Sequence, residues 1–584
     1  MRTWKGKLGA LAAWWGWMPG LYGLVWLVRR FLFEGMKLNQ YMDQFMLANV
    51  WSGSWWLWAW LTVGFIGSAV IVMADVEEYD RGRYYGTTER HTVSRQGASL
   101  VIAIIMVLAT VGGVFKLTTV GWDNDKDEAR YYNRATTFIV PNLDETPATV
   151  RYLLEGATES SRFGCDMVDA SDMHTCIKEG ELDQAGWEPR IGSLDGAVFA
   201  IKRTSGDEQR ISLNEGMVTY LNEWGEQPAR WSGVLDGSGR EQGLGGVSEW
   251  DGSNQTTTCK FEGKYDLDRA FAGERGNSLP NLLAERYPAL RYEQSDVWGY
   301  CDGDEPIVVI PTTKQIQFKD RTVDTAGGLI IVRGQDGQVK LTYVSEAKAG
   351  DYPGPVYPMS LVERQRDMTR WAAGRKNEDR RSFGFEPATS EAQAGNTSEY
   401  LLKNKTTGRL EWVTPLTLRK STSELFVAYA ITPADVVDGG RLNSLSVYIL
   451  GEDDPRRINI DNLEADALDY LAKNAGTFIS NGGKLVEFTP VDGDVWRAFG
   501  ELKGRVVYRL EISASDNITP QLVSVGATGN DNESEGDGND TEFCGQNPSE
   551  LTPNQLVSCI QAMADELDQR QQPGSEPSED SGSN

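Results

Sequence analysis

The sequence predicts a membrane protein in which an N-terminal bundle of three transmembrane helices is followed by a large α+β extracytoplasmic region and a disordered acidic tail. Three observations lead to this fold class. Three uncharged hydrophobic segments, the first two rich in tryptophan, lie in the first 122 residues, all six cysteines come after them, and the balance of charge reverses between the two parts. Residues 1–122 hold 11 Lys and Arg against 7 Asp and Glu, whereas the remainder holds 46 against 77.

The three hydrophobic segments carry no charged side chain and cover residues 8–28, 55–74 and 100–115. About 20 apolar residues are needed to cross a hydrocarbon layer of ~30 Å, so the first two are long enough and the third needs an extension towards Trp122. Arg29 and Arg30 follow the first segment in place of a small-residue cleavage site. We therefore expect a retained signal anchor and not a cleaved signal peptide.

Basic residues predict the orientation, because short loops that carry them stay on the cytoplasmic side. The N-terminus and the loop after the second segment together hold eight positive groups, the terminal amine included, and the loop between the first two segments holds three. The N-terminus is then cytoplasmic, and three crossings place the large C-terminal region outside. This predicts a multi-pass integral membrane protein with membrane lipid as one partner.

Ten of the 19 tryptophans lie within residues 1–60. Indole rings prefer the headgroup boundary, so these residues indicate anchoring, and a quinone or lipid site between the helices is the alternative. No Asp, Glu, Lys, Arg or His lies inside the three segments, which argues against a pump or a secondary transporter. A channel formed by oligomerised spans is the least favoured class, because no span has a polar face. The oligomeric state stays open.

Six cysteines on one side of a membrane predict disulfides in an oxidising compartment, at Cys165, Cys176, Cys259, Cys301, Cys544 and Cys559. Fifteen pairings are open, and pairing of sequence neighbours would join Cys165 to Cys176, Cys259 to Cys301 and Cys544 to Cys559. The chain has only two histidines and no CxxC spacing, so we expect no metal site.

The acidic balance after residue 122 excludes nucleic acid as a partner, because binding depends on neutralising phosphates. We divide this part into an α+β domain at 123–300, a second α+β region at 301–526 that an internal duplication would divide into two related units, and an acidic disordered tail at 527–584. Within the tail, residues 552–570 form an apolar stripe after Thr552-Pro553, which predicts a short helix.

Local patterns predict several elements of the outer domain. Residues 196–202 are expected to form a strand, and residues 148–154, 216–224 and 279–287 are expected to form helices. Residues 328–332 and 338–344 are expected to pair as a hairpin, because Asp336-Gly337 suits a turn with positive φ.

The pentapeptide pattern V-x-P-x-T occurs at 309–313 and again at 413–417, each time in or just before an apolar strand. An internal duplication of one α+β unit would explain the two copies. Chance is the competing explanation, because five residues are a short match.

Residues 360–381 concentrate positive charge in an otherwise acidic region and predict an amphipathic helix. Leu361, Met368 and Trp371 would dock it on a sheet, while its arginines would form ion pairs with the domain's own carboxylates. The alternative is a site for an anionic partner, with Arg366, Arg370 and Arg375 as the partner-binding candidates.

No nucleotide-binding, metalloprotease or serine-hydrolase motif occurs, so no catalytic residue and no cofactor are predicted. The leading hypothesis is a non-enzymatic, membrane-anchored protein that binds a protein or a cell-envelope component. The alternative is a cell-envelope hydrolase that uses a pair of carboxylates, whose spacing a sequence does not reveal.

The tryptophan-rich three-span prefix, the acidic outer domain and the paired V-x-P-x-T strands resemble multi-span membrane proteins of actinobacteria and their phages. The resemblance is one of architecture and implies no activity and no site residue. It adds a third hypothesis, a phage-encoded protein that modifies the host envelope or excludes competing phage.

Overall fold

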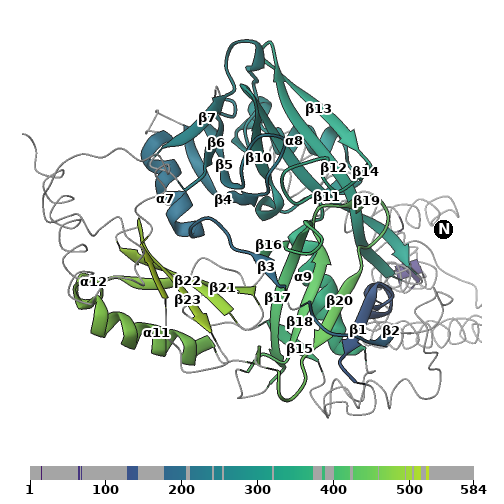
Figure 1. The fold of residues 1–584 in the computed structure, drawn as a ribbon. Helices are drawn as coiled ribbons and strands as arrows, with labels where there is room; N and C mark the ends of the chain where they lie inside the picture. Colours follow the sequence, from purple (N-terminus) through teal and green to yellow (C-terminus); the bar gives the residue numbers. More distant parts are fainter. Residues whose placement is uncertain are drawn as a thin grey trace, which may run out of the picture.

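The computed structural model describes residues 128–142, 176–183, 185–205, 211–239, 242–252, 255–318, 321–372, 384–387, 400–420, 425–454, 456–457, 460–492, 495–502, 505–513 and 521–524, together with Trp15, Gly64, Phe65, Gly67 and Ser68. These residues form three groups of strands (Figure 1). Two sheets that are antiparallel except for the short β5–β8 pairing lie at the top of the view, a large mixed sheet lies at the lower right, and a four-stranded sheet with its helix lies at the lower left.

The two upper sheets pack face to face. The first has the order β4-β5-β6-β7 with β8 beside β5, and the second has the order β10-β11-β12-β13 with β9 beside β11. Apolar side chains from both sheets, such as Val234, Val247, Val308 and Ile330, form one core between them. The strands are β4 (Ile211–Leu221), β5 (Arg230–Gly239), β6 (Gly246–Trp250), β7 (Thr256–Lys260), β8 (Ala272–Gly273), β9 (Leu290–Arg291), β10 (Trp298–Asp302), β11 (Glu305–Phe318), β12 (Arg321–Gln335) and β13 (Gln338–Val344).

Helices α7 (Leu194–Ser205) and α8 (Leu279–Arg286) accompany these sheets, with short 3-10 turns at Gly263–Tyr265, Arg275–Asn277 and Gln294–Asp296. The prediction for residues 279–287 is confirmed: the Ser278 hydroxyl accepts the Asn281 N–H, and Pro280 stands in the first turn. The hairpin is confirmed as well. β12 and β13 are antiparallel, and Asp336 and Gly337 have φ of 48° and 80°.

Two local predictions are wrong. Residues 196–202, expected as a strand, belong to α7, and residues 216–224, expected as a helix, lie mostly in β4. The Ser193 hydroxyl accepts the N–H of Gly196 and so starts α7, which buries Ala197 and Ile201 against sheet residues. β4 buries Leu213, Met217 and Tyr220, a spacing broken by a bulge between Leu213 and Val218.

The mixed sheet has the order β2-β1-β20-β18-β17-β16-β3, with β15 beside β17. Only the β1 pairings with β2 and β20 are parallel. Helix α9 (Met359–Asp367), continued by a 3-10 turn at Met368–Trp371, packs on this sheet, and β14 (Glu346–Ala347) pairs with β19 (Val437–Asp438). The sheet strands are β1 (Thr136–Val140), β2 (Cys176–Glu179), β3 (Trp187–Glu188), β15 (Phe385–Pro387), β16 (Tyr400–Asn404), β17 (Leu410–Leu418), β18 (Ala428–Pro433) and β20 (Leu445–Ile449).

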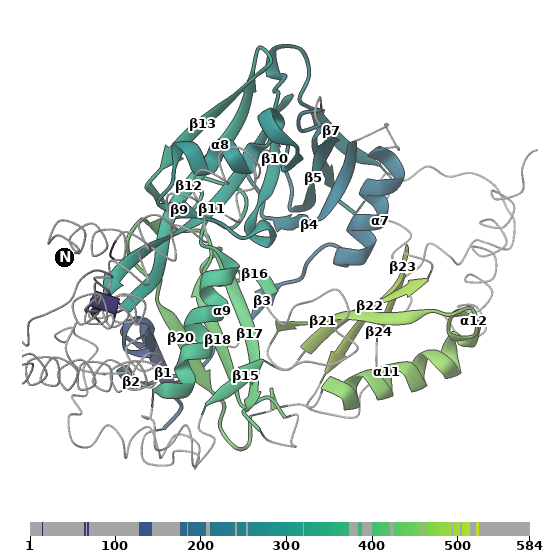
Figure 2. The ribbon, with the colours of Figure 1, turned by 180° about the vertical axis from the view of Figure 1, so that it is seen from behind.

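The four-stranded sheet is an antiparallel meander that lies between α7 and α11 in both views (Figures 1 and 2). Its core is continuous with that of the mixed sheet, and the rings of Phe426 and Trp496 stack at 5.1 Å across the junction. The elements are α11 (Ile460–Asn474), α12 (Gly476–Ser480), β21 (Lys484–Asp492), β22 (Val495–Leu502), β23 (Arg505–Ser513) and β24 (Gln521–Ser524).

The predicted fold class is wrong for the described part of the chain, which is mostly β-sheet with few helices. None of its helices is both long and apolar enough to cross a membrane. The longest, α11, has 15 residues with acidic side chains among them, and it spans about 22 Å against the ~30 Å required. This finding overturns the prediction of a three-helix transmembrane bundle and of a multi-pass integral membrane protein with a cytoplasmic N-terminus and its large C-terminal region outside.

The prediction rested on hydrophobic runs in residues 8–28, 55–74 and 100–115, which lie outside the described residues apart from Trp15, Gly64, Phe65, Gly67 and Ser68. The tail at 527–584, with its expected helix at 552–570, and the expected helix at 148–154 also lie outside them.

The two V-x-P-x-T copies occupy equivalent places in the fold. Each lies on the second strand of a four-stranded antiparallel meander, β10-β11-β12-β13 or β16-β17-β18-β20. Val309 stands between Trp298 and Ile331, and Val413 stands between Tyr400 and Ile431. A helix follows each meander, α9 in one case and α11 in the other. An internal duplication would produce this arrangement, and it stays our interpretation.

Each copy holds one fully buried threonine, Thr312 at the fourth position of the pattern and Thr414 at the second, and their different surroundings give a prediction about stability. Thr312 donates a 2.8 Å hydrogen bond to the Gly328 carbonyl, whereas the buried Thr414 hydroxyl has no partner in the described part of the chain. Thr414→Val should raise the free energy of unfolding by about 1 kcal/mol, because it removes an unsatisfied buried group. Thr312→Val should lower it by about 1 kcal/mol. Chemical denaturation of both variants checks this, and equal changes of one sign would contradict it.

Candidate functional site

A small cavity of about 50 Å³ opens at the β3 end of the mixed sheet. The segment that leads into β3 forms one wall, and strands β16, β17, β18 and β20 supply the rest. The cavity has room for about three water molecules or a group of similar size. Its lining combines two carboxylates, an amide, two aromatic rings and aliphatic side chains: Leu182, Asp183, Gly186, Trp187, Asn404, Glu411, Ile431 and Tyr448.

Glu411 on β17 is the central polar group of this cavity. Trp187 Nε1 donates to its Oε2 at 2.9 Å, and Asn404 Nδ2 donates to the same oxygen at 3.4 Å. No donor from the described residues reaches Oε1. The two oxygens of one carboxyl group therefore have different surroundings, and only Oε1 is left for a ligand.

The pKa values of the two carboxyl groups of the cavity are shifted in opposite directions. Burial raises the pKa of Glu411, and the hydrogen bonds from Trp187 and Asn404 offset this only in part. Hydrogen bonds from the Thr406 side chain and the Ala185 amide lower the pKa of Asp183, which lies near the surface. At neutral pH, Asp183 is thus a fixed negative charge, whereas Glu411 holds its proton to higher pH than an ordinary glutamate.

The cavity wall is held in place by backbone contacts. Arg456 Nη1 donates to the Leu182 carbonyl at 3.2 Å, while Arg456 also pairs with Asp454. The Lys405 N–H donates to the Gly186 carbonyl at 3.2 Å, beside the two-residue pairing of β3 with β16. These contacts fix the segment before Trp187, so the indole N–H is directed at Glu411 before any ligand arrives.

The arginines predicted to bind a partner do not form a cluster on an exposed helix. α9 ends at Asp367 and its 3-10 continuation ends at Trp371, and Arg375 lies outside the described residues. Arg366 is only 6% exposed and contacts Asp367, while the guanidinium of Arg370 lies 5.7 Å from the Trp371 ring centroid. Arg366 is therefore inaccessible to a macromolecular partner. Leu361 is buried, which fits the leading interpretation, in which the helix docks on a sheet.

Cys259 on β7 and Cys301 on β10 form a disulfide, one of the three pairings of sequence neighbours. It joins the two upper sheets. Cys176 is also disulfide-bonded, and Cys165, Cys544 and Cys559 lie outside the described residues.

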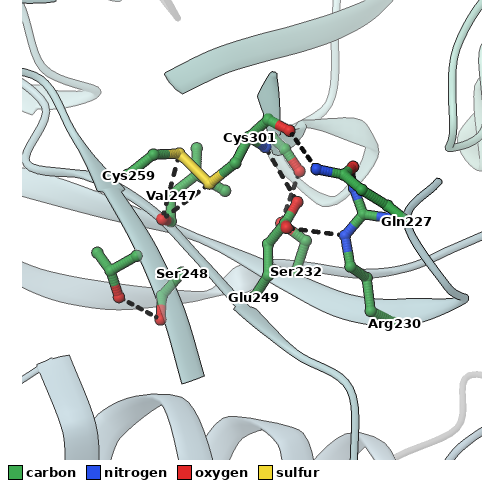
Figure 3. The surroundings of a disulfide bond; sticks show 10 residues. Gln227, Arg230, Ser232, Val247, Ser248, Glu249, Cys259 and Cys301 are labelled. Atoms are coloured by element: carbon green, nitrogen blue, oxygen red, sulfur yellow. Dashed lines mark hydrogen bonds and ion pairs between the residues drawn. A yellow bond between two sulfur atoms is a disulfide. The ribbon is translucent and has the colours of Figure 1, made fainter. Parts of the chain in front are cut away.

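A ring of polar contacts surrounds the Cys259–Cys301 bond (Figure 3). Glu249 forms a salt bridge with Arg230 at 2.8 Å and accepts a hydrogen bond from the Cys301 N–H at 3.0 Å. Gln227 accepts from Arg230 and donates to the Cys301 carbonyl at 3.1 Å. Every charge in this ring is paired within the fold, so the ring is structural.

Other buried carboxylates are also used by the fold itself. Burial raises the pKa of Asp236 to about 6, and this side chain accepts the N–H groups of Phe271 and Ala272. Burial raises the pKa of Asp296 to about 7, and it accepts from the backbone and hydroxyl of Ser360. Neither lines the cavity. In the described ranges, no group of three or more His, Cys, Asp or Glu side chains is arranged to hold a metal ion.

Sequence reasoning missed every polar residue of the cavity. Trp187 and Glu411 are 224 positions apart, and neither belongs to a motif. Glu411 lies in a stretch whose pattern predicts only a strand, and Asp183 is one of 84 acidic residues. No local signal distinguishes them.

Comparison of the chain with models of protein families, with curated proteins and with solved structures finds no match, so its function has to be argued from the cavity itself.

Proposed function

We propose that this protein is a non-enzymatic binding protein that holds a basic side chain of a partner protein in the Glu411 cavity. The observation that carries the proposal is the unused Glu411 Oε1 in a cavity shared with Asp183 and bounded by Trp187 and Tyr448. Carboxylates and aromatic rings are the groups that attract an ammonium or guanidinium ion.

The size and charge of the molecule support the same partner. Pockets that enclose whole small molecules have volumes of about 300–1,000 Å³, whereas this cavity suits the head of one side chain. A net charge of −27 attracts basic surfaces over long range and speeds their encounter.

The opposite pKa shifts of Asp183 and Glu411 also fit a second candidate, a hydrolase with one carboxylate as acid and the other as base or nucleophile. The small volume favours binding, because two catalytic carboxylates have to flank a substrate bond. Glu411-dependent cleavage of a cell-wall glycan by the purified protein would replace the binding proposal with this one.

Binding of n-butylammonium, which copies the end of a lysine side chain, tests the proposal. Glu411→Gln should weaken its binding by about 10- to 100-fold, because a hydrogen bond between two charged groups is replaced by one to a neutral amide. Ligand-observed NMR titration at pH 8 and about 0.15 M salt measures the dissociation constant.

Glu215→Gln is the matched control, since it removes one exposed carboxylate on β4, outside the cavity. It should leave the affinity within about twofold, because salt screens distant exposed charges. Neutral 1-butanol should not compete with the amine. Equal weakening by both substitutions would mean that only net charge attracts the ligand, and it would contradict a role for the cavity.

A further inference from the structure

The two oxygens of Glu411 are fixed in different roles before any ligand binds. Trp187 and Asn404 both donate to Oε2, and together they use the two lone pairs of that oxygen. A proton on the neutral acid therefore belongs on Oε1. The same atom faces no donor from the described chain, so it is also the atom that a ligand cation would contact.

The charged groups around Glu411 are engaged with one another. Arg409 on the loop before β17 donates through Nε and Nη2 to Asp435 after β18. Lys403 on β16 pairs with Glu188 on β3 and with Glu223, and Arg456 pairs with Asp454. Asp183 in the wall and Tyr448 on β20 complete the titratable lining of the cavity. Each of these cations has a carboxylate of its own. Arg409 also lowers the pKa of Glu411, but burial has the larger effect and the net shift is upward.

We infer that a ligand cation and a proton compete for Glu411 Oε1, so that uptake of a basic side chain by the protonated cavity releases one proton to solvent. This inference rests on the proposed function and adds its regulation. In the exchange, the O–H bond at Oε1 breaks, its proton passes to water, and the ammonium N–H of the ligand donates to the resulting carboxylate oxygen. No oxidant or further reactant is needed.

The direction of the pH dependence follows. Burial raises the pKa of Glu411, so the competing proton persists above the range of an ordinary glutamate. Below that pKa, affinity for a permanently charged amine should increase up to tenfold for each unit of pH, and above it affinity should level off. Asp183 does not produce this slope, because its lowered pKa keeps it ionised throughout.

The full-length protein is titrated with n-butylammonium by ligand-observed NMR at pH 5, 6, 7 and 8 and at constant ionic strength. We expect the dissociation constant to fall with rising pH and then to reach a plateau. Glu411→Gln should bind weakly with no slope, because Gln has no proton to exchange at Oε1. A wild-type profile without slope, at measurable affinity, overturns the proton exchange and leaves the proposed function standing.

Trp187→Phe tests the geometry. Losing the indole N–H from Oε2 destabilises the ionised form of Glu411, so the midpoint of the profile should move to higher pH. Trp412→Phe is the matched control, since Trp412 Nε1 donates to the Tyr357 carbonyl at 3.0 Å and not to Glu411, and it should leave the midpoint unchanged. Equal midpoints in the two variants would overturn the assignment of the proton to Oε1. Absence of amine binding at every pH would defeat the proposed function and the inference with it.

Discussion

Replacement of Arg190 by methionine is expected to lower the free energy of unfolding by about 3–5 kcal/mol, the usual cost of breaking a buried ion pair from one side. Arg190 forms a salt bridge with Glu487, and the side chains are only 6% and 2% exposed. Its guanidinium also lies 5.3 Å from the Trp231 ring centroid and 5.7 Å from that of Tyr400. One side chain thus contacts all three groups of strands, and its loss leaves the Glu487 carboxylate buried without its cation.

Guanidinium chloride unfolding measures this change. Burial raises the pKa of Glu487 even beside Arg190, and without Arg190 it should rise further. A carboxyl whose pKa is raised in the folded state costs stability as pH rises, so the loss should be larger at pH 8 than at pH 5. Adding Glu487→Gln to Arg190→Met should recover part of the loss, because no unpaired charge then remains.

The matched control for Arg190 is an exposed pair. Lys473 and Asp469 lie one turn apart on α11 and are 70% and 63% exposed. Asp469→Ala should change stability by about 0.5 kcal/mol or less, since water screens such pairs. Similar losses of unfolding free energy in Arg190→Met and Asp469→Ala would show that the buried Arg190–Glu487 pair stabilises the fold no more than an exposed pair does.

Removal of the Cys259–Cys301 disulfide by a double alanine substitution is expected to cost about 4 kcal/mol. The bond closes a chain segment with a sequence separation of 42, and loops of this size lose considerable entropy in the unfolded state when they are crosslinked. Both cysteines are buried where the upper sheets meet, so the substitution should also weaken the packing of β7 on β10.

Denaturation under non-reducing conditions measures the loss, because reductant would also attack the disulfide of Cys176. Thr258→Ala, next to Cys259 on β7, serves as the control and should cost no more than about 1.5 kcal/mol, the value of its hydrogen bond to Ser248. A double variant as stable as the wild type would mean that the sheets hold together without the crosslink.

Features that depend on a few neighbouring residues could be predicted. Asp336-Gly337 specifies a turn with positive φ, and Ser278 with Pro280 specifies a helix start, because each acts through atoms within one turn of backbone. Residues 196–202 show where this approach fails. Their apolar run suits a buried strand as well as a buried helix, and packing against the sheet of β4–β7 selects the helix.

The candidate site could not be predicted, because its parts have no local signature. Glu411 becomes distinctive only when Trp187 donates to it from 224 residues away and burial raises its pKa. Arg366 shows the opposite case, since a candidate for binding an anionic partner is buried in the structure.

The sequence by itself determined the acidity of the chain, the order of its cysteines, one hairpin and one capped helix. Only the tertiary structure decided which cysteines bond across two sheets, which arginine is buried where the three groups of strands meet, and which carboxylate lines a cavity. The physical reason is the distance along the chain over which each interaction acts. Turn and cap chemistry acts between adjacent residues, whereas burial and pairing of charges depend on segments that meet only when the sheets pack.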